Sequence, residues 1–256
     1  MITIKTPEDI KTLRQAGRYL AEILTALSEK IKTGVSTKEI DDWTMDLCKE
    51  REVVPVFLGY KPHGAPRPYP AAICVSINEE VVHGIPNEKP KILKEGDVVS
   101  LDMGISFKDL IVDSAVTVGV GAIDAKAKKL LEATEKALYI GIEAAKVGAK
   151  TGDIGYAIEK FIKPKGLSLP IELGGHGVGY SVHEDPFIAN FGKKGQGPAL
   201  KEGMVIAIEP MVNEGTARVI FGADGYTVRT ADSKRSAHFE HTIVITKNGP
   251  EILTKL

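Results

Sequence analysis

The chain has 256 residues, of which 43% are hydrophobic, and these values describe an ordinary globular protein rather than a disordered one. A chain of this length can form one large domain. Lys and Arg number 33 against 34 Asp and Glu, so the charge balance provides no broad positive field for nucleic acid or anionic lipid. We therefore do not expect this protein to recognise nucleic acid directly.

Cysteine usage and the first residues favour a cytoplasmic location. The two cysteines, Cys48 and Cys74, are too few for a secreted disulfide scaffold. The opening segment MITIKTPEDIKTL has acids where a signal peptide needs a cationic segment and an apolar block. No apolar run approaches the roughly 20 residues that span a bilayer, so we expect no membrane segment.

The first elements in the chain are two predicted helices. Thr6, with the proline and acids that follow it, forms a favourable helix start. Apolar residues then recur at helical spacing until Gly34, which is expected to close the helix. A capping box at Ser36 begins a second helix that ends near Glu50.

The later elements alternate between strands and helices, with no linker that divides the chain. A loop rich in proline and glycine covers 58–70. Strands are predicted at 72–78, 97–106 and 110–118, helices at 124–147 and 151–164, and strands at 203–212, 226–230 and 238–246.

An internal repeat organises these elements into two halves. The segment LKEGDVVSLD, ending at Asp102, returns as LKEGMVIAIE, ending at Glu209. Upstream, KTGVSTKEI from Lys32 matches KVGAKTGDI from Lys146. The repeat predicts one α+β domain over 1–256, built from similar halves of about 1–122 and 123–256 that face one another across a cleft.

Carboxylates occupy buried strand positions in both halves. With the turn between the first two long strands centred near Phe107, Asp102 and Asp113 are expected directly opposite each other. Like charges about 5 Å apart destabilise a sheet, and burial makes them costlier. A divalent cation resolves this conflict. A lone strand acid is more often a surface residue, but Glu209 and Glu240 lie in similar strands of the second half, so we predict a shared metal site.

Three histidines have a context that suits a ligand or a substrate. His176 lies between glycines in GGHGVG, His183 follows in the same segment, and His83 precedes a glycine. A single histidine of this kind is more often hydrogen-bonded in a turn, but glycine allows close approach of a ligand, and the nearby acids favour a functional role for all three. The others are expected at the surface or behind the residues that contact the ions: His63, His238 and His241.

Rival catalytic motifs are missing. His183-Glu184 is followed by Asp185-Pro186, so there is no H-E-x-x-H motif, and neither a nucleophile elbow nor a phosphate-binding loop occurs. The segment GHGVGY lacks the full spacing of a dinucleotide-binding loop.

Seven ordered segments resemble the methionine aminopeptidases, the bacterial-type single-domain form in particular. They cover essentially the whole chain: EVVHGIP, SLDMG, IVDSAVT, GGHGVG, VHEDP, AIEPM and FEHT. The resemblance implies the α+β pita-bread fold, two pseudo-symmetric halves with a curved antiparallel sheet flanked by helices. It also implies two divalent ions (Mn, Fe, Co or Zn) held by Asp102, Asp113, His176, Glu209 and Glu240.

The same resemblance implies roles around the substrate. Glu209 is expected to act as the acid/base, while His83 and His183 contact the peptide bond. Val182 stands where relatives usually carry Phe, and Tyr226 where they carry Trp. The implied methionine pocket consists of Phe57, Tyr60, Cys74, Val182 and Tyr226.

The implied function is metal-dependent removal of the N-terminal methionine from nascent proteins and peptides, with a preference for a small second residue. We expect a monomer, with the ribosome as a further candidate partner. A prolidase-like or aminopeptidase-P-like enzyme is one alternative, although such enzymes usually carry a large domain before a first helix like the one expected at Pro7. A non-catalytic ribosome-binding relative is another, but it would be expected to lose ligands.

Overall fold

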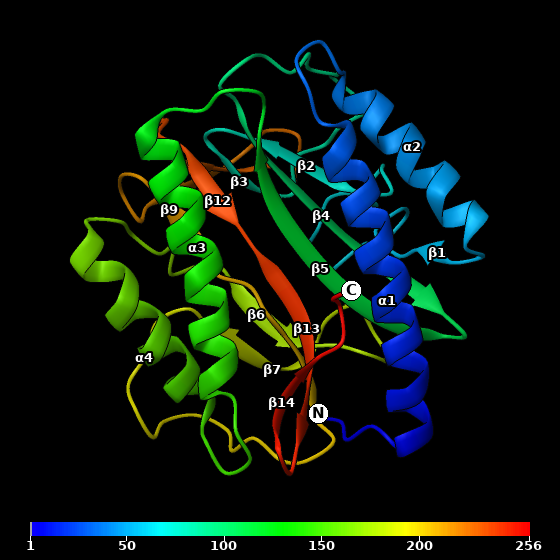
Figure 1. Ribbon diagram of the computed structural model, residues 1–256, viewed down its shortest axis with the longest axis vertical. Coiled ribbons are helices and arrows are strands. Elements are labelled where there is room, and N and C mark those ends of the chain that lie inside the picture. Colours follow the sequence, from blue (N-terminus) through cyan, green and yellow to red (C-terminus); the bar gives the residue numbers. More distant parts are fainter. Residues whose placement is uncertain (1) are drawn as a thin grey trace.

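Four long helices cover one face of a curved sheet in the computed structural model, which describes residues 2–256. Met1, the first residue of the predicted first half, lies outside the described residues. Figure 1 shows α1 and α2 over one half of the sheet and α3 and α4 over the other. The helices are α1 (Pro7–Lys30), α2 (Thr37–Glu50), α3 (Ala125–Ala144) and α4 (Thr151–Ile162), with a 3-10 turn η1 (Lys163–Lys165).

The main sheet is antiparallel, and its central pair joins the two halves of the chain. Its order is β1-β4-β5-β13-β8-β6-β7, with β2 paired to β4 and β14 to β13. The symmetry of this order, β2-β4-β5 against β6-β8-β13, follows the sequence repeat. Its strands are β1 (Val54–Pro55), β2 (Cys74–Ile77), β4 (Val98–Phe107), β5 (Leu110–Gly119), β6 (Gly174–Gly177), β7 (Glu184–Ala189), β8 (Val205–Ile208), β13 (Glu240–Thr246) and β14 (Gly249–Ile252).

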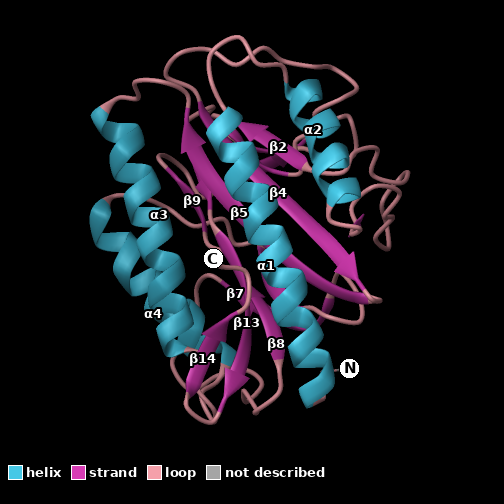
Figure 2. Ribbon diagram, turned by 45° about the vertical axis from the view of Figure 1, so that its right-hand side comes forward, coloured by secondary structure: helices cyan, strands magenta, loops and turns pink. Residues whose placement is uncertain are grey.

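Two small sheets complete the strands and lie beside the main one. One has the order β10-β11-β3 and the other pairs β12 with β9. Figure 2, in which helices and strands have different colours, shows that the helices remain on one side of the main sheet. The additional strands are β3 (Glu80–Val82), β9 (Met211–Asn213), β10 (Val219–Phe221), β11 (Val228–Thr230) and β12 (Ser236–His238).

The predicted helix starts are confirmed. Thr6 and Asp9 form a capping box at α1, and Ser36 and Glu39 form one at α2. The expected end of α1 is wrong: the helix ends at Lys30, and Gly34 lies in the following turn with φ +93°. None of the helices described in 2–256 is both long and apolar enough to cross a bilayer.

Each half of the sheet has its own apolar core. One core joins α1 and α2 to β4 and β5, and the other joins α3 and α4 to β8 and β13. Within α1 the fully buried side chains recur at helical spacing, and truncating any one of them to Ala would cost about 2–5 kcal/mol. These residues are Leu13, Leu20, Ile23 and Leu27. The cores hold the strands that carry the predicted acids.

The predicted register of the first hairpin is wrong by two positions. The turn is Lys108-Asp109, both residues having positive φ (51° and 63°), as in a type I′ hairpin turn. The register therefore pairs Asp102 with Ala115, and Gly104 with Asp113. The two acids are diagonal neighbours on the same face rather than directly opposite, a spacing that leaves more room between the carboxylates.

Both long strands predicted in the last third are broken at an acid. Pro210 cannot donate to a ladder, and the chain leaves β8 at Glu209 to enter β9. Phe239 likewise separates β12 from β13, which begins at Glu240. Each of these acids thus lies where the chain passes between two sheets.

Candidate metal centre

The five predicted metal ligands line one cavity of about 260 Å³. Asp102 comes from β4, Asp113 from β5 and Glu240 from the start of β13, while Glu209 follows β8. Ligand atoms of Asp113, His176 and Glu240 lie within 4.8 Å of one another. Nε2 of His176, in β6, lies 3.4 Å from Oε1 of Glu209. Acids from both halves therefore converge.

The electrostatics of this cluster favour a compensating cation. Burial, followed by the charges of the neighbouring acids, raises the pKa values of Asp102, Asp113, Glu209 and Glu240 well above their usual range. Within residues 2–256 the ion-pair partners of Glu209 and Glu240 are histidines rather than Lys or Arg. Ionised oxygen ligands this close together are stable when divalent cations lie between them.

Unpaired atoms in the cluster fit metal coordination. Oδ1 of Asp113 and Oε1 of Glu240 are buried without a hydrogen-bond partner, and buried polar atoms rarely remain so. Nδ1 of His176 donates to the carbonyl of Gly177 at 2.9 Å, which leaves the Nε2 lone pair free. Carboxylate oxygens with one imidazole suit Mn, Fe, Co or Zn. The residues present therefore fit divalent ions.

Two further histidines lie at the same cavity. His83, after β3, has φ +60° and faces the cavity; burial lowers its pKa to about 4, so the ring is neutral at pH 7. The ring of His183 lies 4.4 Å from that of His176, between centroids. Nδ1 of His183 is 2.8 Å from the hydroxyl of Tyr60. Both rings can thus reach a substrate bound beside the acids.

Four of the five predicted methionine-pocket residues line the cavity: Phe57, Tyr60, Cys74 and Tyr226. Val182, which is buried, is not among the lining residues, whereas its neighbour His183 is. The sequence reasoning missed several lining residues, and the aromatic and apolar character of the segments that carry them was the available signal. These residues are Pro62, Ala65, Tyr69, Leu173, Phe221 and Val228.

Tyr226 closes this pocket by binding the loop at 58–70. Its hydroxyl donates to the carbonyl of Arg67, and its ring lies 5.0 Å from that of Tyr69 in an edge-to-face arrangement. Burial raises the pKa of the Cys74 thiol well above its usual range, so Cys74 contributes a neutral, soft surface. The pocket is apolar and aromatic beside the carboxylates.

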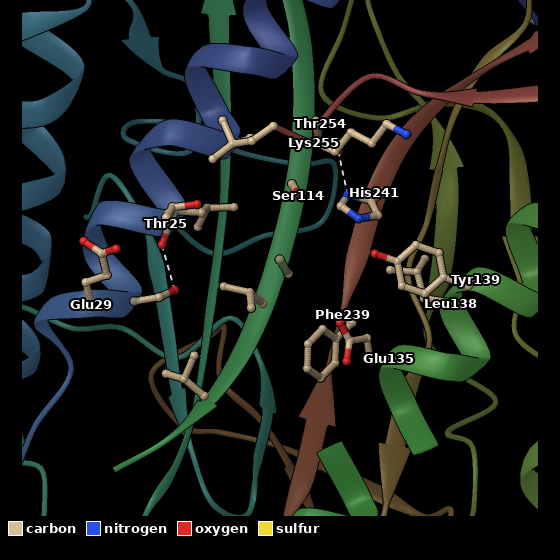
Figure 3. Close-up of a pocket in the computed structure, with 17 residues that line it drawn as sticks. Thr25, Glu29, Ser114, Glu135, Leu138, Tyr139, Phe239, His241, Thr254 and Lys255 are labelled. Carbon is tan, nitrogen blue, oxygen red and sulfur yellow. Dashed lines mark hydrogen bonds between the residues drawn. The ribbon is translucent and has the colours of Figure 1, made fainter. Parts of the chain in front are cut away.

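The remaining histidines take different places. His63 is exposed, whereas His238 is buried, with Nε2 3.5 Å from Oε2 of Glu209. The spacing of two between His238 and Glu240 was the signal that they share a face. His241 belongs to the opposite face. It lines a second cavity, of about 570 Å³, between α1 and α3 (Figure 3), where Nδ1 is 2.9 Å from the hydroxyl of Thr254.

Comparison with known proteins agrees with this geometry. Residues 11–247 match the metallopeptidase family M24. Among curated relatives, the methionine aminopeptidase of Aquifex aeolicus is 47% identical over 100% of this chain and 99% of its own length. Methionine aminopeptidase 1 of Bacillus subtilis is 45% identical over the full length of both chains.

Solved structures extend the comparison to the fold. The crystal structure of methionine aminopeptidase from Thermotoga maritima matches with a TM-score of 0.94 and 42% identity, over 100% of both chains. Prolidase from Pyrococcus furiosus matches with a TM-score of 0.74 and 25% identity, and the match covers 99% of this chain but 65% of the prolidase. The pita-bread fold expected from the sequence is confirmed. The chain belongs to metallopeptidase family M24.

Proposed function

We propose that this protein removes the N-terminal methionine from peptides and nascent chains. The observation that carries the proposal is the convergence of Asp102, Asp113, His176, Glu209 and Glu240 beside an apolar, aromatic pocket. Full-length relatives at 47% and 45% identity that are named methionine aminopeptidases support the same activity.

The five ligands would hold two divalent ions, as the sequence resemblance implies. Asp102 and Asp113 would chelate one, His176 and Glu209 the other, and Asp113 with Glu240 would contact both. When bound, such ions lower the pKa of water toward about 7 and polarise a carbonyl oxygen, which supplies a nucleophile near neutrality.

The side chains around the ions perform the other tasks. Glu209 takes the proton of the attacking water and delivers it to the leaving amine. His183 donates to the carbonyl oxygen of the scissile bond, where negative charge develops. His83, held neutral by burial, hydrogen-bonds the scissile amide.

Pocket size supports the substrate assignment. A cavity of about 260 Å³ is slightly smaller than most ligand pockets, which are commonly about 300–1,000 Å³, and it suits one side chain rather than a long peptide. Phe57, Tyr60 and Tyr226 provide apolar walls, and the thiol of Cys74 provides a soft contact for a thioether. A small second residue is expected to be preferred, as in the resemblance.

Two other activities are less well supported. The match covers 65% of the prolidase from Pyrococcus furiosus, whereas the methionine aminopeptidase relatives match end to end. A non-catalytic ribosome-binding relative would have no reason to retain a buried cluster of acids with unpaired oxygens. Methionine removal remains the better proposal.

The wider biological assignment is also a proposal. We place the protein in the cytoplasm, as a monomer, with the ribosome as a candidate partner, and the free state of Cys48 and Cys74 suits a reducing compartment. We further propose that the chain is one catalytic domain with halves of about 1–122 and 123–256. That division falls between the end of β5 at Gly119 and the start of α3 at Ala125.

A peptide assay tests the function. Metal-loaded protein should release methionine from Met-Ala-Ser and leave Lys-Ala-Ser intact. Preferred cleavage of X-Pro dipeptides would favour the prolidase alternative, and no hydrolysis of any peptide with any of the four metals would favour the non-catalytic one.

A further inference from the structure

A buried ion pair ties the amino-terminal segment to the loop that carries His183. Nζ of Lys5 lies 2.6 Å from Oε2 of Glu184, and the side chains are 0% and 6% exposed. The residues are 179 positions apart in the chain. Burial lowers the pKa of Lys5, and the partnership with Glu184 opposes that effect. A lysine is almost never fully buried without such a partner.

Glu184 is the centre of a saturated hydrogen-bond network. Its Oε1 accepts from the backbone N–H groups of Tyr180 and Ser181, at 2.6 Å and 3.1 Å. Its Oε2 accepts from Lys5 and from the hydroxyl of Thr3. The carboxylate thus fixes both ends of the turn at 180–184, and the ammonium supplies its only charge compensation among these donors.

Other contacts hold the amino-terminal segment and this turn together. The hydroxyl of Tyr180 donates to Oδ2 of Asp9 at 2.6 Å, and Nζ of Lys5 lies 4.8 Å from the centroid of the Tyr180 ring. Gly179, with φ +140°, packs so closely that a Cβ there would lie 2.3 Å from Cε of Lys5. The backbone N–H of Lys5 donates to Gly203 at 2.8 Å. The lysine is held at both ends.

The turn presents His183 to the candidate active site. His183 precedes Glu184 directly, and its ring contacts His176 and Tyr60 at the cavity. The residue itself is exposed, and both of these contacts are made by its ring. Its placement depends on the backbone of the turn, and that backbone depends on Glu184.

We propose that Lys5 is a positioning residue for catalysis: its buried ammonium holds Glu184, and through it the 180–184 turn, so that His183 meets the substrate carbonyl. This inference rests on the proposed function. The competing interpretation is that the ion pair only stabilises the fold. The two differ in whether Lys5 acts through His183, because only then do substitutions at the two positions fail to add.

A double-mutant cycle tests this. In Lys5→Met, which keeps most of the length of the side chain and removes its charge, kcat for Met-Ala-Ser should fall by roughly 10- to 100-fold, since an error of about 1 Å in placement can cost that much. The KM and the metal affinity should change less. In a His183→Ala background, Lys5→Met should change kcat by less than about 2-fold. Additive effects, or an unchanged kcat in Lys5→Met, would overturn the proposal.

Histidine NMR provides a readout that needs no turnover. In metal-free protein labelled with ¹⁵N-histidine, Lys5→Met should shift or broaden the ring signals of His183, assigned with His183→Ala, and leave those of exposed His63 in place. Unchanged His183 signals would contradict the proposal even if the enzyme is active. Wild-type protein without peptidase activity would instead contradict the proposed function.

Two further variants guard against misreading. Lys11→Met removes an exposed charge from α1, which begins shortly after Lys5, and it should leave kcat and the His183 signals unchanged. If Lys5→Met does not fold, Glu184→Gln replaces it in the same cycle, because it keeps the shape of the side chain and removes the charge that Lys5 neutralises. An additive cycle with that variant also overturns the proposal.

Discussion

The two halves of the sheet bring acids to the candidate metal centre by different routes. In the first half, β4 and β5 are consecutive strands joined by a two-residue turn, and Asp102 and Asp113 lie inside continuous ladders. In the second half, β8 and β13 pair across 31 intervening residues, and Glu209 and Glu240 lie at breaks between two sheets. The pairing of two consecutive strands can be predicted from a local sequence pattern. The pairing of strands that are separated by a long segment depends on the fold of the whole chain.

The largest expected effect is the loss of activity on removing one acid from either half, which tests whether both halves contribute to one metal site. Asp113→Ala and Glu240→Ala should each lower kcat/KM for Met-Ala-Ser by at least about 1,000-fold, which corresponds to about 4 kcal/mol, and each should reduce bound metal. His241→Gln, beside Glu240 but on the opposite face, is the control and should keep its activity. Near-normal turnover in either alanine variant would show that its half does not contribute to the site.

A smaller effect, on stability at low pH, is expected from His241, which lies on the face of β13 opposite the one that carries Glu240. Burial, with a contribution from Lys255, lowers the pKa of His241 to about 4 from its ordinary 6.5. The unfolded chain therefore binds a proton that the folded chain does not, and stability is lost as pH falls from about 6.5 to 4. By pH 4 this loss should reach roughly 3 kcal/mol in wild type relative to His241→Gln. Urea unfolding of wild type and His241→Gln at pH 7 and pH 4 would measure this difference. An equal loss of stability in the two proteins between these pH values would refute it.

Metal-free stability compares the halves directly. Since burial and mutual repulsion raise the pKa values of Asp113 and Glu240, their ionised forms destabilise the apo fold, and that cost grows as pH rises above the ordinary carboxyl range. At pH 7, Asp113→Asn and Glu240→Gln should each stabilise apo protein by about 1–2 kcal/mol. Added Mn²⁺ should make wild type more stable than either variant, because only wild type has the complete set of charged ligands. Thermal unfolding of the three proteins with and without Mn²⁺ measures these differences. A loss of apo stability in both variants would contradict the electrostatic argument.

The smallest effect concerns the two-residue turn that joins β4 and β5 in the first half. Lys108 and Asp109 adopt the left-handed region, which asparagine and glycine occupy more readily. Lys108→Asn with Asp109→Gly should raise the free energy of unfolding by about 1 kcal/mol. Because the register does not change, kcat should stay at the wild-type value. A drop in kcat would mean that the turn does more than connect two strands.

Much of this arrangement could be predicted from the sequence, and the failures have physical causes. Helix starts follow from local chemistry, as at Thr6 and Ser36, and both were predicted correctly. The hairpin register was not, because a shift of the turn by one residue moves every pair by two. The break at Glu209 had a local signal in Pro210, which cannot donate to a ladder. The break at Phe239 has no such signal, because it depends on which sheet each segment joins.

The candidate site shows the same limit. The repeat and the seven motifs identified residues that the fold brings to one cavity. Tyr69 was missed because no local context distinguishes it, and His238 could be placed only at the surface or behind the metal-contacting residues, of which the second agrees with its position beside Glu209. Val182 was included, although it is not among the residues that line the cavity. Contacts such as that of Lys5 with Glu184 join residues that are 179 positions apart in the chain, so no local sequence pattern predicts them.

The most direct test of the central claim, that acids from both halves share divalent ions, is anomalous diffraction from crystals grown with Mn²⁺. Two anomalous peaks are expected inside the cavity, both in contact with Asp113 and Glu240, one shared with Asp102 and the other with His176 and Glu209. Peaks confined to the acids of one half, or a cavity without anomalous density at saturating Mn²⁺, would contradict it.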